Sequence, residues 1–313
     1  MLLHELLNIR YPIIQGAMAN IATPQFAASV SNAGGLGIIA TGAMNPEETR
    51  AAIRLCKTLT DKPFGVNVMM MNPYTKEIFD VIMEEKVTMV TTGAGNPAPY
   101  VEGLKQAGIK VFPVVPSVGL ARRLEQSGVD ALIVEGTESG GHVGELTTMA
   151  LVPQVVDAVS IPVIAAGGIA SGRQFNAALS LGAIGVQIGT CLLVAKECPI
   201  HENYKQTVLK AKDTDTVVTG RSAGVPVRIY KNQMAQEYIG LERQLANKEE
   251  LERLTLGALR KAVFDGDMKR GSVMMGQVAG MCKSERTLAE ILSSIMSEAK
   301  EELLFLQEKH TCL

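Results

Sequence analysis

The chain has 313 residues, of which 47% are hydrophobic and 20% charged, and its formal net charge is −2. This length fits one large domain, or one barrel that carries an inserted subdomain. No stretch has the density of Lys and Arg that neutralises a nucleic-acid backbone, so the composition argues against nucleic acid as a partner and for a small ligand.

The first segment, MLLHELLNIRYPII, places Glu5 and Arg10 inside its apolar run and lacks the basic start and small-residue cleavage site of a secretion signal. No run of about 18 apolar residues appears that could span a membrane. The five cysteines form no CxxC pair, which argues against a zinc site and against a disulfide framework. We therefore expect a cytoplasmic protein with reduced thiols and no bound metal.

Eight short apolar or β-branched runs alternate with helical patterns along the chain, which is typical of repeated βα units. The predicted strands are 12–18, 36–41, 64–68, 88–92, 110–116, 131–135, 162–166 and 184–188. Eight units match a (β/α)8 TIM barrel better than a doubly wound sheet, which usually has five or six strands. The dinucleotide fingerprint GxGxxG is also absent.

The helices between these strands carry recognisable start and stop signals. In the segment 45–60, Asn45 is placed to cap a helix and Pro46 fits its first position. Gly108, Gly128 and Gly182 each follow a helical run and precede a strand, where a left-handed residue commonly ends a helix.

Two segments depart from the βα rhythm. The connection 136–148 is long and glycine-rich, and such loops in barrels generally carry function. Residues 196–270 become charged and helical, with 14 Lys and Arg against 11 Asp and Glu. We expect a barrel built from residues 1–195 and 271–313, with a mainly helical lid or substrate subdomain inserted at 196–270.

The active site of such a barrel forms at the carboxyl ends of its strands, so residues at those ends are the candidates. Gly167 and Gly168 follow the seventh strand and Gly189 follows the eighth, where bare backbone N–H groups can bind a phosphate. The alternative is that these glycines only permit tight turns. Because they occur as a pair of turns in this position, we predict a phosphorylated ligand.

Three polar side chains are candidates for contact with that ligand. His142 lies between glycines in the long loop, which we expect to be mobile, and is the best candidate acid or base; the alternative is an exposed loop histidine. Asn67 and Gln187 end strands where an apolar side chain would pack better, so a flavin ring edge could pair with their amides; the alternative is a bond to neighbouring backbone. Met69, Met70, Met71, Met274 and Met275 could line an apolar pocket or fill an irregular core.

The motifs QGAM, FGVN, TTGAGNP, PVVPSV, EGTESGGHVGELTTM, PVIAAGGIA, QIGT and SVMMGQVAG together are similar to those of a known family. The chain resembles the flavin-dependent enoyl-acyl carrier protein reductase II of bacterial fatty acid synthesis, within the superfamily that includes nitronate monooxygenases. The resemblance runs from about Leu7 to the terminal helix and is weakest in the insert. It implies a barrel with FMN at the strand ends, NADH or NADPH as electron source, a trans-2-enoyl thioester on acyl carrier protein as substrate, and a homodimer.

The resemblance, with the placement at strand ends, predicts one catalytic residue and a cofactor-binding set. His142 matches the family's active-site histidine, which we expect to donate a proton to the α-carbon or to position the donor. The predicted cofactor-binding residues are Gly16, Ala17, Met18, Asn67, Thr92, Gly93, Glu135, Gly140, Gly141, Gly167, Gly168, Gln187, Gly189, Thr190, Met275 and Gln277.

Two other functions compete with the reductase. Nitronate monooxygenases usually have glutamine where this chain has Glu135, and the sequence ELTTM does not usually follow their histidine, so both departures favour the reductase. A barrel that binds a phosphorylated ligand without turnover is the other alternative. The positive charge of residues 196–270 fits docking of an acidic carrier protein, but a solvated charged face explains it equally well.

Overall fold

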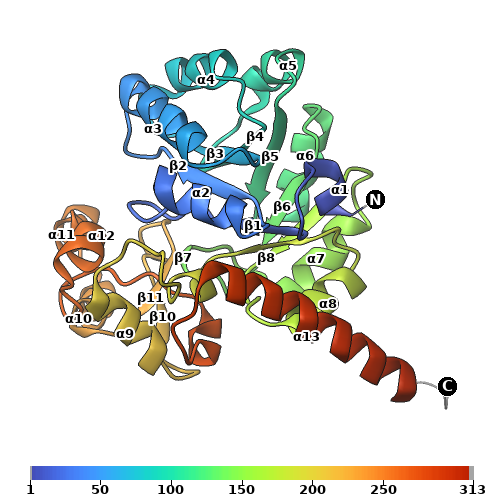
Figure 1. Ribbon diagram of the computed structural model, residues 1–313. Coiled ribbons are helices and arrows are strands. Elements are labelled where there is room, and N and C mark those ends of the chain that lie inside the picture. Colours follow the sequence, from blue (N-terminus) through green and yellow to red (C-terminus); the bar gives the residue numbers. More distant parts are fainter. Residues whose placement is uncertain (1, 310–313) are drawn as a thin grey trace.

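All eight expected runs form strands of one parallel sheet, each within a few residues of its predicted bounds. A computed structural model describes residues 2–309 and is shown in Figure 1. The strands are β1 Ile13–Gln15, β2 Gly37–Ala40, β3 Phe64–Met69, β4 Met89–Gly93, β5 Lys110–Val115, β6 Leu132–Glu135, β8 Val163–Ala166 and β9 Val186–Ile188. They neighbour one another in the order β1-β9-β8-β6-β5-β4-β3-β2, and a parallel bridge between Ile14 and Leu36 brings β1 against β2. The predicted (β/α)8 barrel is confirmed.

Helices surround this sheet, and their ends follow the local signals in the sequence. They are α1 Leu3–Leu7, α2 Pro24–Asn32, α3 Pro46–Leu59, α4 Thr75–Glu84, α5 Ala98–Gln106, α6 Val118–Gln126, α7 Thr148–Val156, α8 Gly172–Ser180 and α13 Leu288–Lys309. Asn45 caps α3 by accepting a hydrogen bond from the Glu48 N–H at 2.9 Å. Gly108, Gly128 and Gly182 have φ angles of +77°, +80° and +97°, as predicted for helix ends. Within residues 2–309, no helix is both long enough and apolar enough to cross a bilayer.

Side chains alternate along each strand between the inside of the barrel and the helix layer. One cluster contains Ile38, Met89 and Phe112, together with Leu3 and Leu7 of α1. Apart from α1, no helix contributes a residue to this cluster, and its other members lie on or beside the strands. The cluster is therefore the barrel interior. The alternate strand residues pack in a second cluster with the helices. Apolar side chains thus fill the barrel below its carboxyl end, where the functional site is expected.

The insert is richer in structure than its charged sequence suggested. Helices predominate, as expected: α9 Glu202–Lys210, α10 Gln233–Arg243, α11 Lys248–Thr255 and the short α12 Ala258–Arg260, followed by a π-helical turn at Lys261–Asp265. Two strands of the insert, β10 Thr216–Thr219 and β11 Val227–Tyr230, were not predicted from the sequence. They form an antiparallel sheet with a third strand, β7 Gly141–His142, which belongs to the glycine-rich loop.

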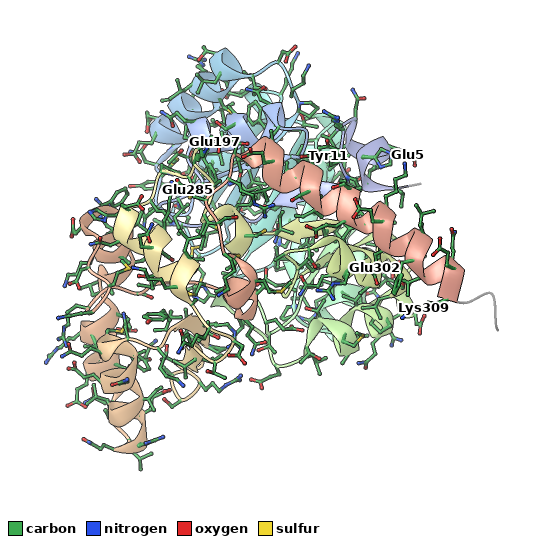
Figure 2. All side chains as sticks on the ribbon, turned by 60° about the horizontal axis from the view of Figure 1, so that its bottom comes forward. Glu5, Tyr11, Glu197, Glu285, Glu302 and Lys309 are labelled. Carbon is green, nitrogen blue, oxygen red and sulfur yellow. The ribbon has the colours of Figure 1, made fainter. Side chains whose placement is uncertain are left out.

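After the insert the chain returns over the barrel and completes the ring of helices with α13 (Figure 1). This helix packs closely on α8, because a Cβ at Gly172 would lie 2.1 Å from the Ala299 nitrogen. The Leu288 N–H at the start of α13 donates to the Glu197 carboxylate at 3.0 Å. Figure 2 shows Glu197 beside that end of α13, with Glu302 and Lys309 toward the other end.

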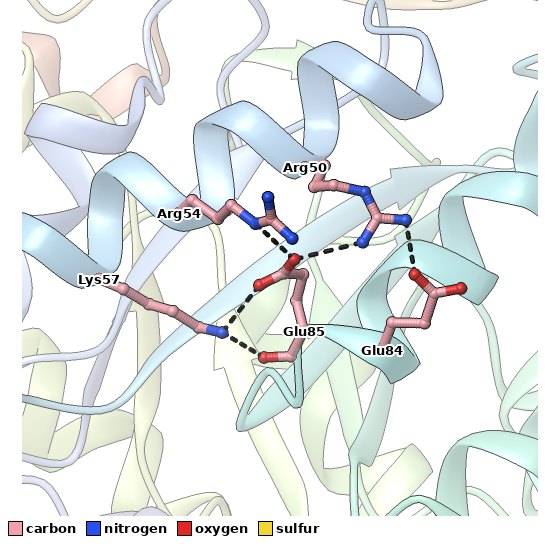
Figure 3. A network of polar contacts seen from close by, with 5 residues as sticks. All are labelled: Arg50, Arg54, Lys57, Glu84 and Glu85. Carbon is pink, nitrogen blue, oxygen red and sulfur yellow. Dashed lines mark hydrogen bonds and ion pairs between the residues drawn. The ribbon is translucent and has the colours of Figure 1, made fainter.

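A network of charged side chains joins α3 to the end of α4 on the outer surface (Figure 3). The carboxylate of Glu85, whose side chain is only 9% exposed, pairs with Arg50 at 3.3 Å, Arg54 at 2.8 Å and Lys57 at 3.1 Å. Arg50 also pairs with Glu84 at 2.6 Å. One buried carboxylate therefore pairs with cations from three turns of α3.

Candidate active site

A cavity of about 500 Å³ opens at the carboxyl ends of the strands, where the sequence placed the site. This volume lies within the usual range for small-molecule sites. The predicted residues that line it are Gly16, Ala17, Met18, Asn67, Gly93, Glu135, Gly140, Gly141, His142, Gly167, Gly168, Gln187, Gly189 and Thr190. Met69 and Met274 line it as well, whereas Met70, Met71 and Met275 do not.

Three predicted cofactor-binding residues do not line the cavity. Thr92 is buried, and its hydroxyl has no hydrogen-bond partner among residues 2–309. It alternates with Gly93, which lines the cavity, so its side chain belongs to the opposite face of β4. In the return segment, Met275 is fully buried and Gln277 is exposed, and Met274 and Val278 line the cavity in their place.

The two strand-end amides differ in their hydrogen bonding. The Asn67 Nδ2 donates to the Thr91 hydroxyl at 2.9 Å. For this nitrogen, the alternative to a flavin contact, a hydrogen bond to a neighbouring residue, therefore holds. The Gln187 amide is only 8% exposed and has no side-chain hydrogen bond among the described residues. A buried amide that faces a cavity in this state is suited to pair with a polar ligand edge.

The glycine turns after β8 and β9 have the features of an anion site. Gly167 and Gly168 have φ angles of +91° and +72°, which favour glycine. In the described part of the chain, the backbone N–H groups of Gly168, Gly189 and Thr190 donate to no other group. Free N–H groups at the rim of a cavity fit a phosphate, and the Thr190 hydroxyl is held nearby by accepting from the Gly276 N–H at 2.9 Å.

His142 lies on a strand and not in a free loop, which corrects the expectation of a mobile position. Its backbone is in register with Val227 of β11, so the insert holds it in place. The side chain is exposed, as the alternative of an exposed histidine held, and it also lines the cavity. Desolvation lowers the pKa of His142 below its ordinary value, because it disfavours the charged imidazolium.

Two carboxyl groups on the same loop and strand end also line the cavity. Burial raises the pKa of Glu135 to about 7, although the Ser139 hydroxyl, which donates to its Oε1 at 2.6 Å, acts in the opposite direction. Glu138 has a different role: both of its oxygens accept from the Thr148 N–H at 2.9 Å, and its Oε2 accepts from the Thr148 hydroxyl at 3.0 Å. Glu138 thereby ties the loop to the start of α7.

Some lining residues were missed by the reading of the sequence. Ala40 and Val114 line the cavity, and each lies two residues beyond an interior residue, Ile38 and Phe112. The period of two along the strands could have identified them. Nothing comparable marks Leu259 of the insert, because only the folding of distant segments brings it to the cavity.

A comparison with protein-family models identifies the group to which this site belongs. The model described as nitronate monooxygenase matches residues 1–85 and 76–298, which together are most of the chain. The chain belongs to the nitronate monooxygenase family. It is therefore an oxidoreductase of this superfamily, whose members are flavin enzymes.

Individual relatives within this superfamily have different names. A solved structure of FabK from Thermotoga maritima is 46% identical, with a TM-score of 0.95 and coverage of 98% of both chains. An indene-carboxyl-CoA dehydrogenase from Rhodococcus jostii is 34% identical over 93% of this chain and 81% of its own length. A probable nitronate monooxygenase from Staphylococcus aureus is 34% identical over 88% of this chain and 90% of its own length.

Proposed function

We propose that this protein reduces the trans-2 double bond of an enoyl thioester carried on acyl carrier protein, using FMN and NADH or NADPH. The observation that carries the proposal is the 46% identity to FabK over 98% of both chains, against 34% to the probable nitronate monooxygenase. FabK denotes enoyl-acyl carrier protein reductase II. The name of the Rhodococcus relative also denotes an enzyme of an acyl thioester.

The residues of the cavity fit FMN and an acyl thioester. The free N–H groups of Gly168, Gly189 and Thr190 would hold the phosphate, and the Asn67 and Gln187 amides would face the ring. FMN, when bound, supplies the hydride-carrying chemistry. Apolar Met274 and Val278 of the return segment would cover the reacting groups and exclude water.

The partners follow from the same proposal. Acyl carrier protein is acidic, and the net positive charge of residues 196–270 is compatible with docking it beside the cavity. A homodimer, expected from the resemblance, belongs to the proposal, as does a cytoplasmic location, expected from the cysteines and the first segment.

The discriminating experiment compares two substrates on the purified protein. NADH or NADPH is mixed with a short trans-2-enoyl thioester, and in a separate vessel a nitroalkane is supplied under oxygen. We expect nicotinamide oxidation that depends on the enoyl thioester. Consumption of the nitroalkane alone would make the protein a nitronate monooxygenase, and a colourless protein without turnover would make it a binding barrel.

His142→Ala tests whether the site lies in this cavity. Its enoyl reduction should fall by about 10²-fold or more if His142 contacts the reacting groups. The control is His201→Ala, because His201 accepts from the Asn203 N–H at the start of α9 and does not line the cavity. Full turnover by His142→Ala with bound FMN would refute its role.

A further inference from the structure

Three titratable side chains line the cavity: Glu135, Glu138 and His142. Reduction of an enoyl group needs one proton in addition to the hydride, so one of these groups, or water, must supply it. We propose that Glu135 is the acid of this site, carrying its proton on Oε2 and delivering it to the substrate. This inference rests on the proposed enoyl reduction, and it replaces our expectation that His142 is the donor.

Glu138 is unsuited to the role because its carboxylate is already occupied. The two oxygens accept from the backbone N–H and the hydroxyl of Thr148 at 2.9 to 3.0 Å. These hydrogen bonds hold both Glu138 oxygens at the start of α7, so the side chain anchors the loop and is not free to approach a substrate.

His142 is a poor acid near neutral pH. Desolvation lowers its pKa below the ordinary value of 6.5, so the neutral imidazole predominates at pH 7. A neutral imidazole can accept a proton or orient a ligand, but it cannot readily give a proton to carbon. The surroundings in the cavity thus raise the pKa of Glu135 and lower the pKa of His142. This difference favours Glu135 as the acid and His142 as the base.

The geometry of Glu135 suits a carboxylic acid. The Ser139 hydroxyl donates to Oε1 at 2.6 Å, so Oε1 serves as the acceptor and the acid proton belongs on Oε2. Oε2 has no protein partner among the described residues, and the partly exposed Glu135 side chain lines the cavity. Burial raises its pKa to about 7, so a large fraction is protonated at neutral pH.

No cation offsets the burial of Glu135. The flanking strands β5 and β8 present Val114, Pro116 and Ala166 to the cavity, and α7 contains no titratable residue. The charged or titratable groups that share the cavity are Glu138 and His142 alone among its lining residues. No cation among these lining residues therefore stabilises the ionised form of Glu135.

The proposed step balances in protons and electrons. NADH or NADPH is oxidised, and its hydride arrives at the β-carbon of the enoyl group. The O–H bond of Glu135 Oε2 breaks as a C–H bond forms at the α-carbon, which leaves Glu135 as a carboxylate. A proton from solvent then restores the acid, with the Ser139 hydroxyl holding Oε1 throughout.

Infrared spectroscopy on the purified protein tests the protonation state without turnover. With ¹³C-labelled glutamate, the carbonyl stretch of a protonated carboxyl should disappear on raising the pH with a midpoint near 7, and it should be missing in Glu135→Gln. In Ser139→Ala the midpoint should move upward, because the hydroxyl favours the ionised form. Absence of the band in the wild type at pH 6 would overturn the proposal.

Turnover supplies the second arm. Glu135→Gln should reduce an enoyl thioester about 10²- to 10⁴-fold more slowly and lose the fall in rate that the wild type shows as pH rises through 7. The control is Glu145→Gln, since Glu145 lies in the same loop, is exposed and does not line the cavity. If Glu135→Gln kept that pH limb and His142→Ala lost it, the proton would come from His142. A wild type that reduces no enoyl thioester refutes the proposed function, whereas the infrared result decides separately whether Glu135 holds the proton.

Discussion

The close approach of the return segment to the glycine-rich loop can be tested by adding one methyl group. A Cβ at Gly140 would lie 2.7 Å from the Met275 carbonyl carbon and 2.8 Å from the Gly276 nitrogen. Ordinary contact begins at 3.4 Å, and both neighbours are backbone atoms that cannot rotate away. Gly140→Ala must therefore displace the return segment, with Met274, from the cavity.

The expected cost follows from the overpacking of a tight site, about 1 to 3 kcal/mol. For a domain of this size that corresponds to a fall in Tm of roughly 1.5 to 5 °C, measured by differential scanning calorimetry. Flavin retained through purification, measured by visible absorbance, should fall as well. Gly119→Ala is the matched control, because no atom lies within 4 Å of its added methyl and α6 should gain up to about 1 kcal/mol. A Gly140→Ala protein with unchanged Tm and full flavin would refute this account of the cavity roof.

Three further substitutions test burial and charge elsewhere in the chain. Glu85→Gln should lower the free energy of unfolding by about 1 kcal/mol at pH 7, a value kept small because its partners are largely exposed. Burial opposes ionisation of Glu85, but hydrogen bonds from Lys57 and Arg54 outweigh burial and lower the pKa of Glu85. The stabilisation by Glu85 is therefore present above the pKa of the unfolded state and is lost as the pH falls through the pKa of the folded state. Urea unfolding at pH 7 and pH 3 should therefore separate wild type from Glu85→Gln only at the higher pH. Tyr204→Phe should lower the free energy of unfolding by about 1 to 2 kcal/mol in the same assay, because the hydroxyl of the fully buried Tyr204 donates to the Met274 carbonyl at 2.6 Å. An unchanged free energy of unfolding would contradict that hydrogen bond. The Cys312→Ser variant lacks the cysteine that lies outside the described residues and keeps the four buried ones. A thiol reagent should label none of these four before denaturation, because burial raises the pKa of Cys56 to about 12 and of Cys282 to about 11. Rapid labelling of the native protein would contradict this packing.

The barrel could be predicted because its signals are local. Each strand is a short apolar run, and several helices carry their own end signals, as Asn45 and Gly108 show. The hairpin β10–β11 escaped prediction because its strands lie inside a charged, largely helical segment that breaks the βα rhythm. Their pairing with β7 links residues more than 80 positions apart in sequence, such as His142 and Val227, and no local pattern encodes it.

The sequence predicted those residues of the cavity that are brought there by the position of the backbone alone. Gly167, Gly168 and Gly189 lie at the cavity because parallel strands end at one edge of the barrel. Thr92 was misplaced because strand ends were counted without the alternation of faces. The chemical states of Glu135 and His142 could not be predicted, because their pKa values depend on burial that only the folded chain defines.

The insert contributes directly to the candidate site. β11 pairs with β7 and so holds His142, while the buried Arg228 of β11 donates from Nε to the Thr137 carbonyl at 2.9 Å. Opening the insert as a rigid body would carry Arg228 away with β11, so it would break the β7–β11 pairing and remove the hydrogen bond to the Thr137 carbonyl. Each lost hydrogen bond costs about 0.5 to 1.5 kcal/mol, so the contacts that position His142 also oppose this movement.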